Sequence, residues 1–401
     1  DAIRGSELPQ AGLDASVTRE RLTENGLFPP PYGGAHFTPT DAHLGLGWDA
    51  DLFGRTKSQI AAALGQARAA QADADVAAQQ LALAVVRSYF QLARLESQRA
   101  VAERTLEQRR QMLGLVDQRV KAGLDTVVEK LQGEEAIPAT RTRIESLDEQ
   151  IALVRHQLAA LTAQPMDACA TLAPTLDTLH AAPQPATIGA DLLARRPDIA
   201  AALARVEAAG HAVAAQRARF YPDVSFTAMA GFNSLSVGNV FEWASRNWSF
   251  GPALHLPIFE GGTLRAQLRG RDAERDAAID AYNQAVVDAV HEAADAATSS
   301  GAIARQQAQQ SQALQSAVSS YQYAQQRYAQ GLGNQLIVLN AETQMLAERQ
   351  ADVDLRWRAL DNQAQLMKAL GGGWNEPAAG ASTAVPLPPA ATAATDDHPP
   401  A

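Results

Sequence analysis

The chain has 401 residues, of which 46% are hydrophobic, 19% charged and only 5% aromatic. Its net charge of −10, from 34 basic and 44 acidic residues, argues against nucleic acid as a partner, because phosphate binding needs clustered Lys and Arg. Cys169 is the only cysteine, which excludes an internal disulfide, and no apolar run approaches the ~18 residues of a membrane helix.

The first part of the chain, residues 1–164, is expected to contain two strands and then two long helices. The strands are predicted where apolar residues alternate with polar residues or Gly, and the helices where Pro is scarce and apolar residues return at helical spacing. The expected bounds are about 9–20 and 42–53 for the strands, and 55–120 and 126–161 for the helices. The first helix would be about 100 Å long, which no compact soluble domain accommodates.

The second part, residues 188–374, has the same order after an inter-repeat linker over 165–187. Its expected elements are a helix over 188–219, strands over 222–233 and 247–259, and helices over 263–329 and 335–370. Heptad-like Leu, Val and Ala indicate coiled-coil packing of the long helices. The Pro- and Ala-rich stretch over 375–401 is expected to be a disordered tail.

Short motifs recur between the two parts at a nearly constant spacing. The segment 118–125 returns over 326–333, an offset of 208 residues, and Leu52-Phe53 returns as Ile258-Phe259 at an offset of 206. Upstream, Leu8-Pro9 corresponds to Tyr221-Pro222 at an offset of 213. We infer a tandem duplication of one structural unit.

Four strands with one apolar face and one polar or Gly face are typical of a transmembrane β-barrel, the alternative being two hairpins of a soluble sandwich. One chain has too few strands to close a barrel, and unpaired strand edges are costly in lipid, so a homo-oligomer with 8, 12 or 16 strands is expected. Candidate lumen residues lie on the polar face, where their charge predicts a cation-preferring pore. They are Asp14, His43, Asp49, Asp51, Asp223 and His255.

Several motifs carry a family resemblance over about 8–374. They are Trp48 to Arg55 (WDADLFGR), Arg195 to Ile199 (RRPDI), Ala218 to Pro222 (ARFYP), Leu256 to Gly262 (LPIFEGG) and Leu370 to Trp374 (LGGGW). With them the chain resembles the TolC-like outer-membrane factors, specifically the NodT-like, lipoprotein-type channels of resistance-nodulation-division (RND) efflux pumps. The resemblance implies a mainly α fold with β: a homotrimer with a 12-stranded β-barrel in the outer membrane of a Gram-negative bacterium, continued by a periplasmic α-barrel.

The resemblance also implies partners and sites. A periplasmic adaptor would dock at the helical tips and an inner-membrane RND pump would supply energy, with outer-membrane lipid around the barrel. The tip residues are Arg119, Gly123, Leu124, Arg327, Gly331 and Leu332, and the periplasmic gate positions are Leu336, Asn340 and Thr343, with Glu342 nearby. The family's gate often carries an Asp and an Arg where this chain has Asn340 and Thr343, so a neutral gate is expected.

The first helices of the first repeat, and the lipidated N-terminal Cys of the family, would precede Leu8 and are expected to be absent from this chain. No phosphate-binding or His-Glu-x-x-His motif occurs, so neither an enzyme nor a metal site or other cofactor is expected. The leading interpretation is a passive outer-membrane exit duct for drugs and other small toxic compounds. A type I protein-secretion channel and a soluble periplasmic coiled-coil scaffold or adaptor are the alternatives.

Overall fold

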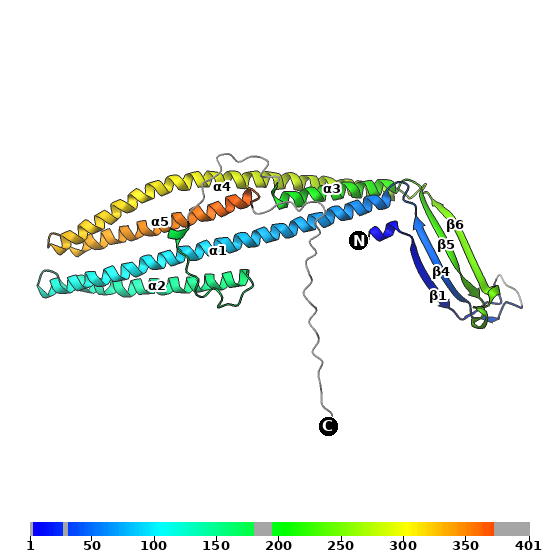
Figure 1. Cartoon of the computed structure of the whole chain (residues 1–401), viewed down its shortest axis with the longest axis horizontal. Coiled ribbons are helices and arrows are strands. Elements are labelled where there is room, and N and C mark those ends of the chain that lie inside the picture. The colour runs from blue at the N-terminus through cyan, green and yellow to red at the C-terminus, as the bar shows by residue number, and fades with distance from the viewer. Residues whose placement is uncertain (1–2, 27–30, 180–194, 373–401) are drawn as a thin grey trace, which may run out of the picture.

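The structure, a computed structural model, describes residues 3–26, 31–179 and 195–372. A long body of helices carries a sheet at one end (Figure 1). The predicted tail over 375–401 and the first residues of the predicted helix over 188–219 lie outside the described residues.

Two very long helices, α1 (Arg55–Lys121) and α4 (Thr263–Ala329), run the length of the helical body (Figure 1). Each has 67 residues and therefore extends about 100 Å. At the end remote from the sheet they turn back into α2 (Val127–Leu161) and α5 (Gln335–Ala369). The shorter α3 (Pro197–Ala218) packs against both α1 and α4.

Local sequence explains where the hairpins turn. Gly123 and Gly331 end the long helices with φ of +71° and +75°, a left-handed conformation that suits Gly at a helix C-terminus. The return helix α2 begins with a capping box. The Thr126 side chain accepts a hydrogen bond from the Glu129 backbone N–H, and the Glu129 carboxylate accepts one from the Thr126 backbone N–H. Asn334 caps α5 by accepting a hydrogen bond from the Ile337 amide at 3.1 Å.

The sheet has four antiparallel strands in the order β1-β4-β5-β6. Their bounds are Gln10–Val17, Thr40–Asp49, Asp223–Ser234 and Arg246–His255. A small second hairpin, β2 (Glu20–Arg21) with β3 (His36–Phe37), lies in the connection between β1 and β4 and was not predicted. Four short 3₁₀ turns complete the described elements: η1 (Arg4–Glu7), η2 (Leu176–Thr178), η4 (Val237–Asn239) and η5 (Trp243–Ser245).

The strand register places like residues on the same face. Leu13 lies opposite Leu44, and across β5 the same row ends at Trp248. The adjacent row contains Asp14 opposite His43. The sheet therefore has one apolar face and one polar face, as the alternation predicts.

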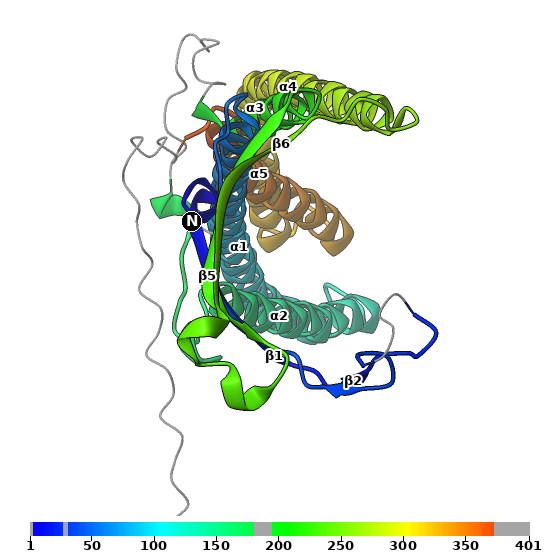
Figure 2. The same ribbon diagram turned by 90° about the vertical axis from the view of Figure 1, so that its right-hand side faces the viewer.

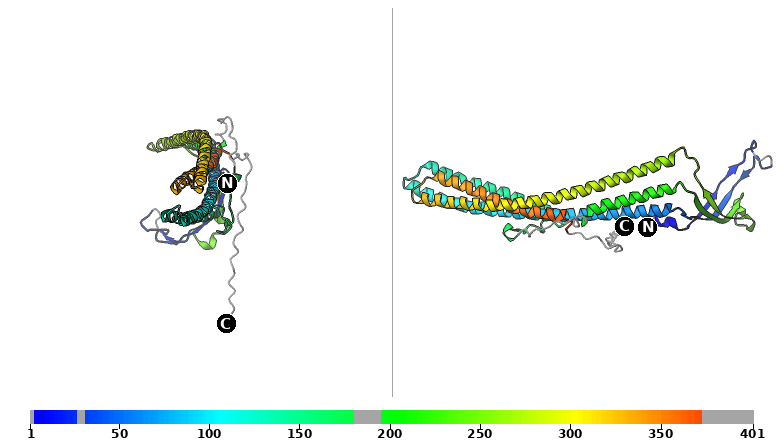
Figure 3. Two further views of the ribbon diagram at one scale, coloured as in Figure 1. Left: turned by 90° about the vertical axis from the view of Figure 1, so that its left-hand side faces the viewer. Right: turned by 90° about the horizontal axis from the view of Figure 1, so that it is seen from above.

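Small residues allow the helices to approach closely. Gly65 of α1 faces Ala208 of α3, and a Cβ on Gly65 would come within 2.8 Å of the Ala208 Cβ. Buried Ala also lines α4 at Ala289 and Ala293. Seen along the long axis, the helices lie along an arc rather than around a closed core (Figures 2 and 3).

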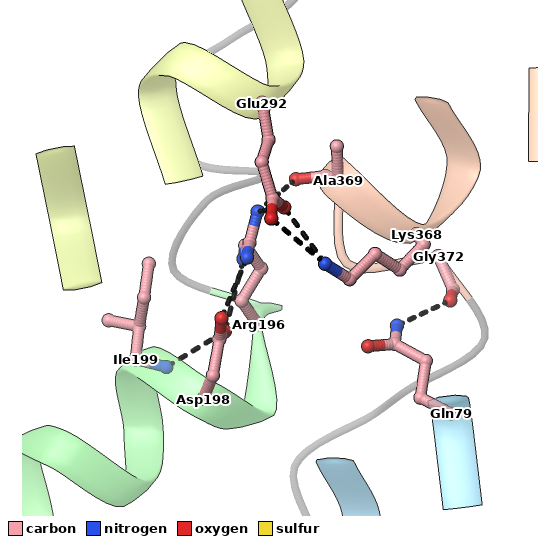
Figure 4. A network of polar contacts seen from close by, with 8 residues as sticks. All are labelled: Gln79, Arg196, Asp198, Ile199, Glu292, Lys368, Ala369 and Gly372. Atoms are coloured by element: carbon pink, nitrogen blue, oxygen red, sulfur yellow. Dashed lines mark hydrogen bonds and ion pairs between the residues drawn. The ribbon is translucent and has the colours of Figure 1, made fainter. Parts of the chain in front are cut away.

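An ion cluster around the buried Arg196 joins three helices midway along the body (Figure 4). Arg196, just before α3, bonds Asp198 at 2.7 Å, Glu292 of α4 at 2.9 Å and the Ala369 carbonyl of α5 at 3.3 Å. Lys368 adds a second contact to Glu292. The cluster fixes the C-terminus of α5 against α3 and α4.

Within the described residues, no helix is long and apolar enough to cross a membrane.

Candidate functional site

The two helical tips are joined by a cluster of three side chains, Arg119, Asp125 and Tyr328. Arg119 of α1 donates two hydrogen bonds to the Asp125 carboxylate, at 2.8 and 3.2 Å, and one to the Tyr328 carbonyl at 3.0 Å. Its guanidinium carbon lies 4.5 Å from the centre of the Tyr328 ring. The Tyr328 hydroxyl donates to Asp125, which closes the triangle.

Charge and burial set the ionisation of this cluster. The hydrogen bonds from Arg119 hold the pKa of Asp125 below its usual range, and that from Tyr328 acts in the same direction. Burial, together with the neighbouring Asp125 carboxylate, raises the pKa of Tyr328. At neutral pH the cluster is therefore an arginine–carboxylate pair with a neutral phenol.

Arg119 lies differently from the other residues predicted for adaptor docking. As a docking residue it should face outward, yet its side chain lies between the tips and is mostly buried. Its repeat counterpart Arg327 is exposed, and among the described residues it makes one side-chain hydrogen bond, to the Leu332 carbonyl at 3.3 Å. The other predicted tip residues, Gly123, Leu124, Gly331 and Leu332, are exposed.

Sequence reasoning missed Asp125 and Tyr328. Asp125 stands two residues after the Gly123 turn, and Tyr328 replaces the Val120 of the first repeat. The change from Val to Tyr was the one available signal. The contact between Arg119 and Tyr328 could not be predicted from local sequence, because the two residues are 209 positions apart in the chain.

The structure separates the four residues predicted for the gate. Leu336, Asn340 and Thr343 lie on one exposed face of α5, at spacings of four and three residues. Glu342 is buried on the opposite face, where its carboxylate accepts a hydrogen bond from Arg109 at 3.1 Å. In this chain the Glu342 charge holds α5 against α1, so Glu342 does not share the exposed face of the other three predicted gate residues.

Arg109 also bonds to α2, the third helix of this region. It donates to the Ala136 carbonyl and the Thr140 hydroxyl of α2, at 3.0 and 2.8 Å. One side chain of α1 thus contacts both return helices just above the tips.

The predicted lumen residues lie on the polar face of the sheet, with one exception. His43 lies between two carboxylates, with Nδ1 2.5 Å from Asp41 and Nε2 3.8 Å from Asp14. At the helical end of the sheet, Arg55 bridges Asp49 at 3.5 Å and Asp223 at 2.8 Å. His255 lies directly across from Asp223.

Asp51 is the exception. β4 ends at Asp49, and the backbone at Asp51 has a φ of +39°, so the alternation assumed for this position has already ended. Its carboxylate accepts hydrogen bonds from the Thr56 and Lys57 amides, both at 2.9 Å. Asp51 therefore caps the first turn of α1 instead of lining the polar face of the strand.

No group of three or more His, Cys, Asp or Glu side chains suited to a metal ion occurs among the described residues. The prominent polar contacts in the described parts of the chain are structural: they hold helices together or connect helices to strands.

Comparison with known proteins identifies the family. The family model described as "Outer membrane efflux protein" matches residues 1–164 and 189–372. The probable efflux pump outer membrane protein SepC of Pseudomonas putida is 31% identical over 373 residues, which cover 93% of this chain and 77% of SepC. The fusaric acid resistance protein FusA of Burkholderia cepacia is 37% identical over 67% of this chain, and the match spans about half of FusA (52%).

A solved structure agrees with these relatives. The outer membrane protein VceC of Vibrio cholerae superposes with a TM-score of 0.85 at 30% identity, covering 93% of this chain and 89% of VceC. The mainly helical architecture with a small sheet is therefore that of the TolC-like channels. The chain belongs to the outer membrane efflux protein family, whose members act as outer-membrane components of efflux systems rather than as enzymes.

Proposed function

We propose that three copies of this chain form one continuous duct. Their sheets would close into a 12-stranded β-barrel in the outer membrane, and their helices would continue it as an α-barrel into the periplasm. One observation carries the proposal: a four-stranded sheet with an exposed apolar face is joined directly to helices that lie along an arc.

Closure has a physical cause. β1 and β6 are the outer strands of the sheet, so each has an edge of backbone N–H and C=O groups without a strand partner in the part of the chain that the structure describes. Such groups cost several kcal/mol each in hydrocarbon, and only a closed barrel removes all of them. Twelve strands leave a lumen wider than side chains alone can fill.

The polar face would then line the lumen. Asp14, Asp41, Asp49 and Asp223 carry negative charge there, and Arg55 offsets one of them. The remaining negative charge favours cations over anions in the barrel.

The helical tips would meet the periplasmic partners. Leu124 and Leu332 are exposed at the two tips and offer apolar contacts to an adaptor. Leu336, Asn340 and Thr343 would form a neutral constriction just above the tips. The duct itself would be passive, with energy supplied by an inner-membrane RND pump.

The names of the relatives support small toxic compounds as the substrates. FusA is named for resistance to fusaric acid and SepC as part of an efflux pump. These names support efflux over the alternative of type I protein secretion. The soluble scaffold, the third hypothesis, gives no reason for the exposed apolar face of the sheet.

Matched charge substitutions on the two faces test the barrel. Phe250 of β6 lies on the apolar face and its neighbour Ser249 on the polar face. We expect Phe250→Asp to impair outer-membrane insertion and drug resistance in a complemented efflux-deficient strain, because a charge on the lipid face is destabilising near mid-membrane, although Asp costs less than the roughly 2–4 kcal/mol of Arg or Lys. Ser249→Asp should retain both. Equal tolerance of both substitutions, with the protein in the soluble periplasm, would contradict the proposal.

A further inference from the structure

A small cavity lies just above the helical tips, where α1, α2, α4 and α5 meet. Each of the four helices contributes to its wall, and the residues that matter here are Arg109, Gly133, Tyr321, Gln335 and Glu342. The cavity measures about 20 Å³, which exceeds the roughly 10–15 Å³ that one water molecule needs. It therefore has room for a ligand of that size.

Gln335, the first residue of α5, indicates that this cavity binds a ligand. Its side chain is only 1% exposed, yet neither Oε1 nor Nε2 of its amide has a hydrogen-bond partner among the described residues. The Nε2 atom lies close to α2, since a Cβ added to Gly133 would be 3.7 Å from it. Native proteins pair almost all such buried groups with protein atoms or with ordered water, because a buried amide without a partner is costly.

Two more polar groups border the same cavity. Glu342 follows Gln335 by seven residues on the same face of α5, and its Oε1 atom accepts the hydrogen bond from Arg109 at 3.1 Å. The Oε2 atom retains lone pairs for a second donor. On α4, burial and then the charge of Glu342 raise the pKa of the Tyr321 hydroxyl, which is therefore a neutral hydrogen-bond donor.

The charges around the cavity favour a neutral ligand. Arg109 and Glu342 form a buried pair, so together they offer no net charge to either a cation or an anion. The amide of Gln335 needs a donor for Oε1 and an acceptor for Nε2. A ligand of this size that can both donate and accept is a water molecule.

We propose that this cavity is a binding site for one structural water molecule, which pairs the Gln335 amide and connects it to Tyr321 or Glu342. Buried waters of this kind make about three hydrogen bonds to groups that would otherwise be unpaired. The water fixes the start of α5, because Gln335 directly precedes Leu336, the first of the predicted gate residues. The site lies within one chain and goes beyond the proposed duct, on which it does not depend.

A crystal structure of the purified full chain, at a resolution that shows ordered waters, tests the site directly. We expect one water peak within hydrogen-bond distance of the Gln335 amide and of the Tyr321 hydroxyl or the Glu342 carboxylate. A cavity without a water peak would overturn the proposal. So would a Gln335 amide that bonds directly to another side chain. This test needs no variant, so it stands even if a substituted chain does not fold.

Hydrogen exchange of the amides over 335–342 supplies a second test in solution. Gln335→Met keeps the length of the side chain but removes its polar atoms, and Gln344→Met makes the same change on the exposed face of α5. We expect Gln335→Met to exchange about fivefold faster than the unsubstituted chain, because the hydrogen bonds through the water are lost. Gln344→Met should exchange at the unsubstituted rate. Slower or unchanged exchange in Gln335→Met would overturn the proposal, since removal of an unpaired amide stabilises the turn.

Discussion

Arg119 lies over the ring of Tyr328 and donates a hydrogen bond to the Tyr328 carbonyl at 3.0 Å. Because Arg119 belongs to the α1/α2 hairpin and Tyr328 to the α4/α5 hairpin, this one side chain makes the two tips a single unit. Asp125 completes the link by bonding both residues.

Removing the Arg119 guanidinium should loosen the tips, whereas removing that of Arg327 should not. We expect Arg119→Gln to lower the opening free energy of the tip by about 3 kcal/mol, since it leaves the mostly buried Asp125 carboxylate without its cation. Arg327→Gln loses one exposed hydrogen bond and should change the opening free energy of the tip by less than about 0.5 kcal/mol. Hydrogen exchange of amides over 115–130 and 325–337 measures both, and equal effects would contradict the assigned roles.

The same link should depend on pH. The pKa of Asp125 is lower in the folded tip than in an unfolded chain, so its stabilisation is present above the unfolded value, about 3.9, and is lost as the pH falls through the folded value. We expect tip opening to become easier as the pH is lowered from about 5 to 3. The tip of the Asp125→Asn variant should open more easily at neutral pH, and its opening free energy should lack this dependence on pH. Comparing the hydrogen-exchange profiles of the variant and the unsubstituted chain would detect both effects.

The two turn glycines should be required for their backbone conformation. A Cβ on Gly123 would meet no other atom within 4 Å, yet its φ is +71°. Asn accepts this conformation more readily than other residues, and Val accepts it poorly. Gly123→Asn should therefore preserve drug resistance in a complemented strain, and Gly123→Val should reduce it. Loss of resistance in both variants would instead point to a space requirement in tip-to-tip or adaptor contacts.

Asn340 and Glu342 should respond differently to a change of charge. In the proposed constriction, Asn340→Asp adds a carboxylate per subunit on the exposed face of α5 and should increase the preference for cations in single-channel recordings. Glu342→Gln removes a buried charge paired with Arg109 and should lower stability while leaving selectivity unchanged. If only Glu342→Gln changed the selectivity, the gate would have been assigned to the wrong face of α5.

The ion cluster around Arg196 offers a test of the mid-body packing, with its neighbour Arg195 as control. Arg196 is buried and bonds three partners, whereas Arg195 is exposed. We expect Arg196→Gln to reduce the unfolding free energy by about 2 kcal/mol, because its charge-assisted hydrogen bonds to the partly exposed Asp198 and Glu292 are lost, and Arg195→Gln to have little effect. Thermal unfolding of the purified oligomers compares them, and equal melting temperatures would refute the structural role of the cluster.

The periodic parts of the chain were predictable from sequence. Alternation placed β1, β4, β5 and β6 within four residues at each end, and the absence of Pro placed α1 and α4 within one. Both signals are local and repeated many times, so errors at single residues average out.

The sites were less predictable, because they depend on contacts between distant segments. Nothing near Glu342 in the sequence indicates that Arg109, 233 residues away, buries its charge. Asp51 was placed in a strand because it continues an alternating pattern, but a left-handed backbone at that residue ends the strand early.

Single-channel recording of the purified full chain in a planar bilayer, under a salt gradient, tests the central claim most directly. The account predicts discrete conductance steps from a water-filled pore with a reversal potential that indicates cation preference. An absence of conductance from membrane-inserted protein would contradict the duct, and a preference for anions would contradict the assignment of the polar face to its lumen.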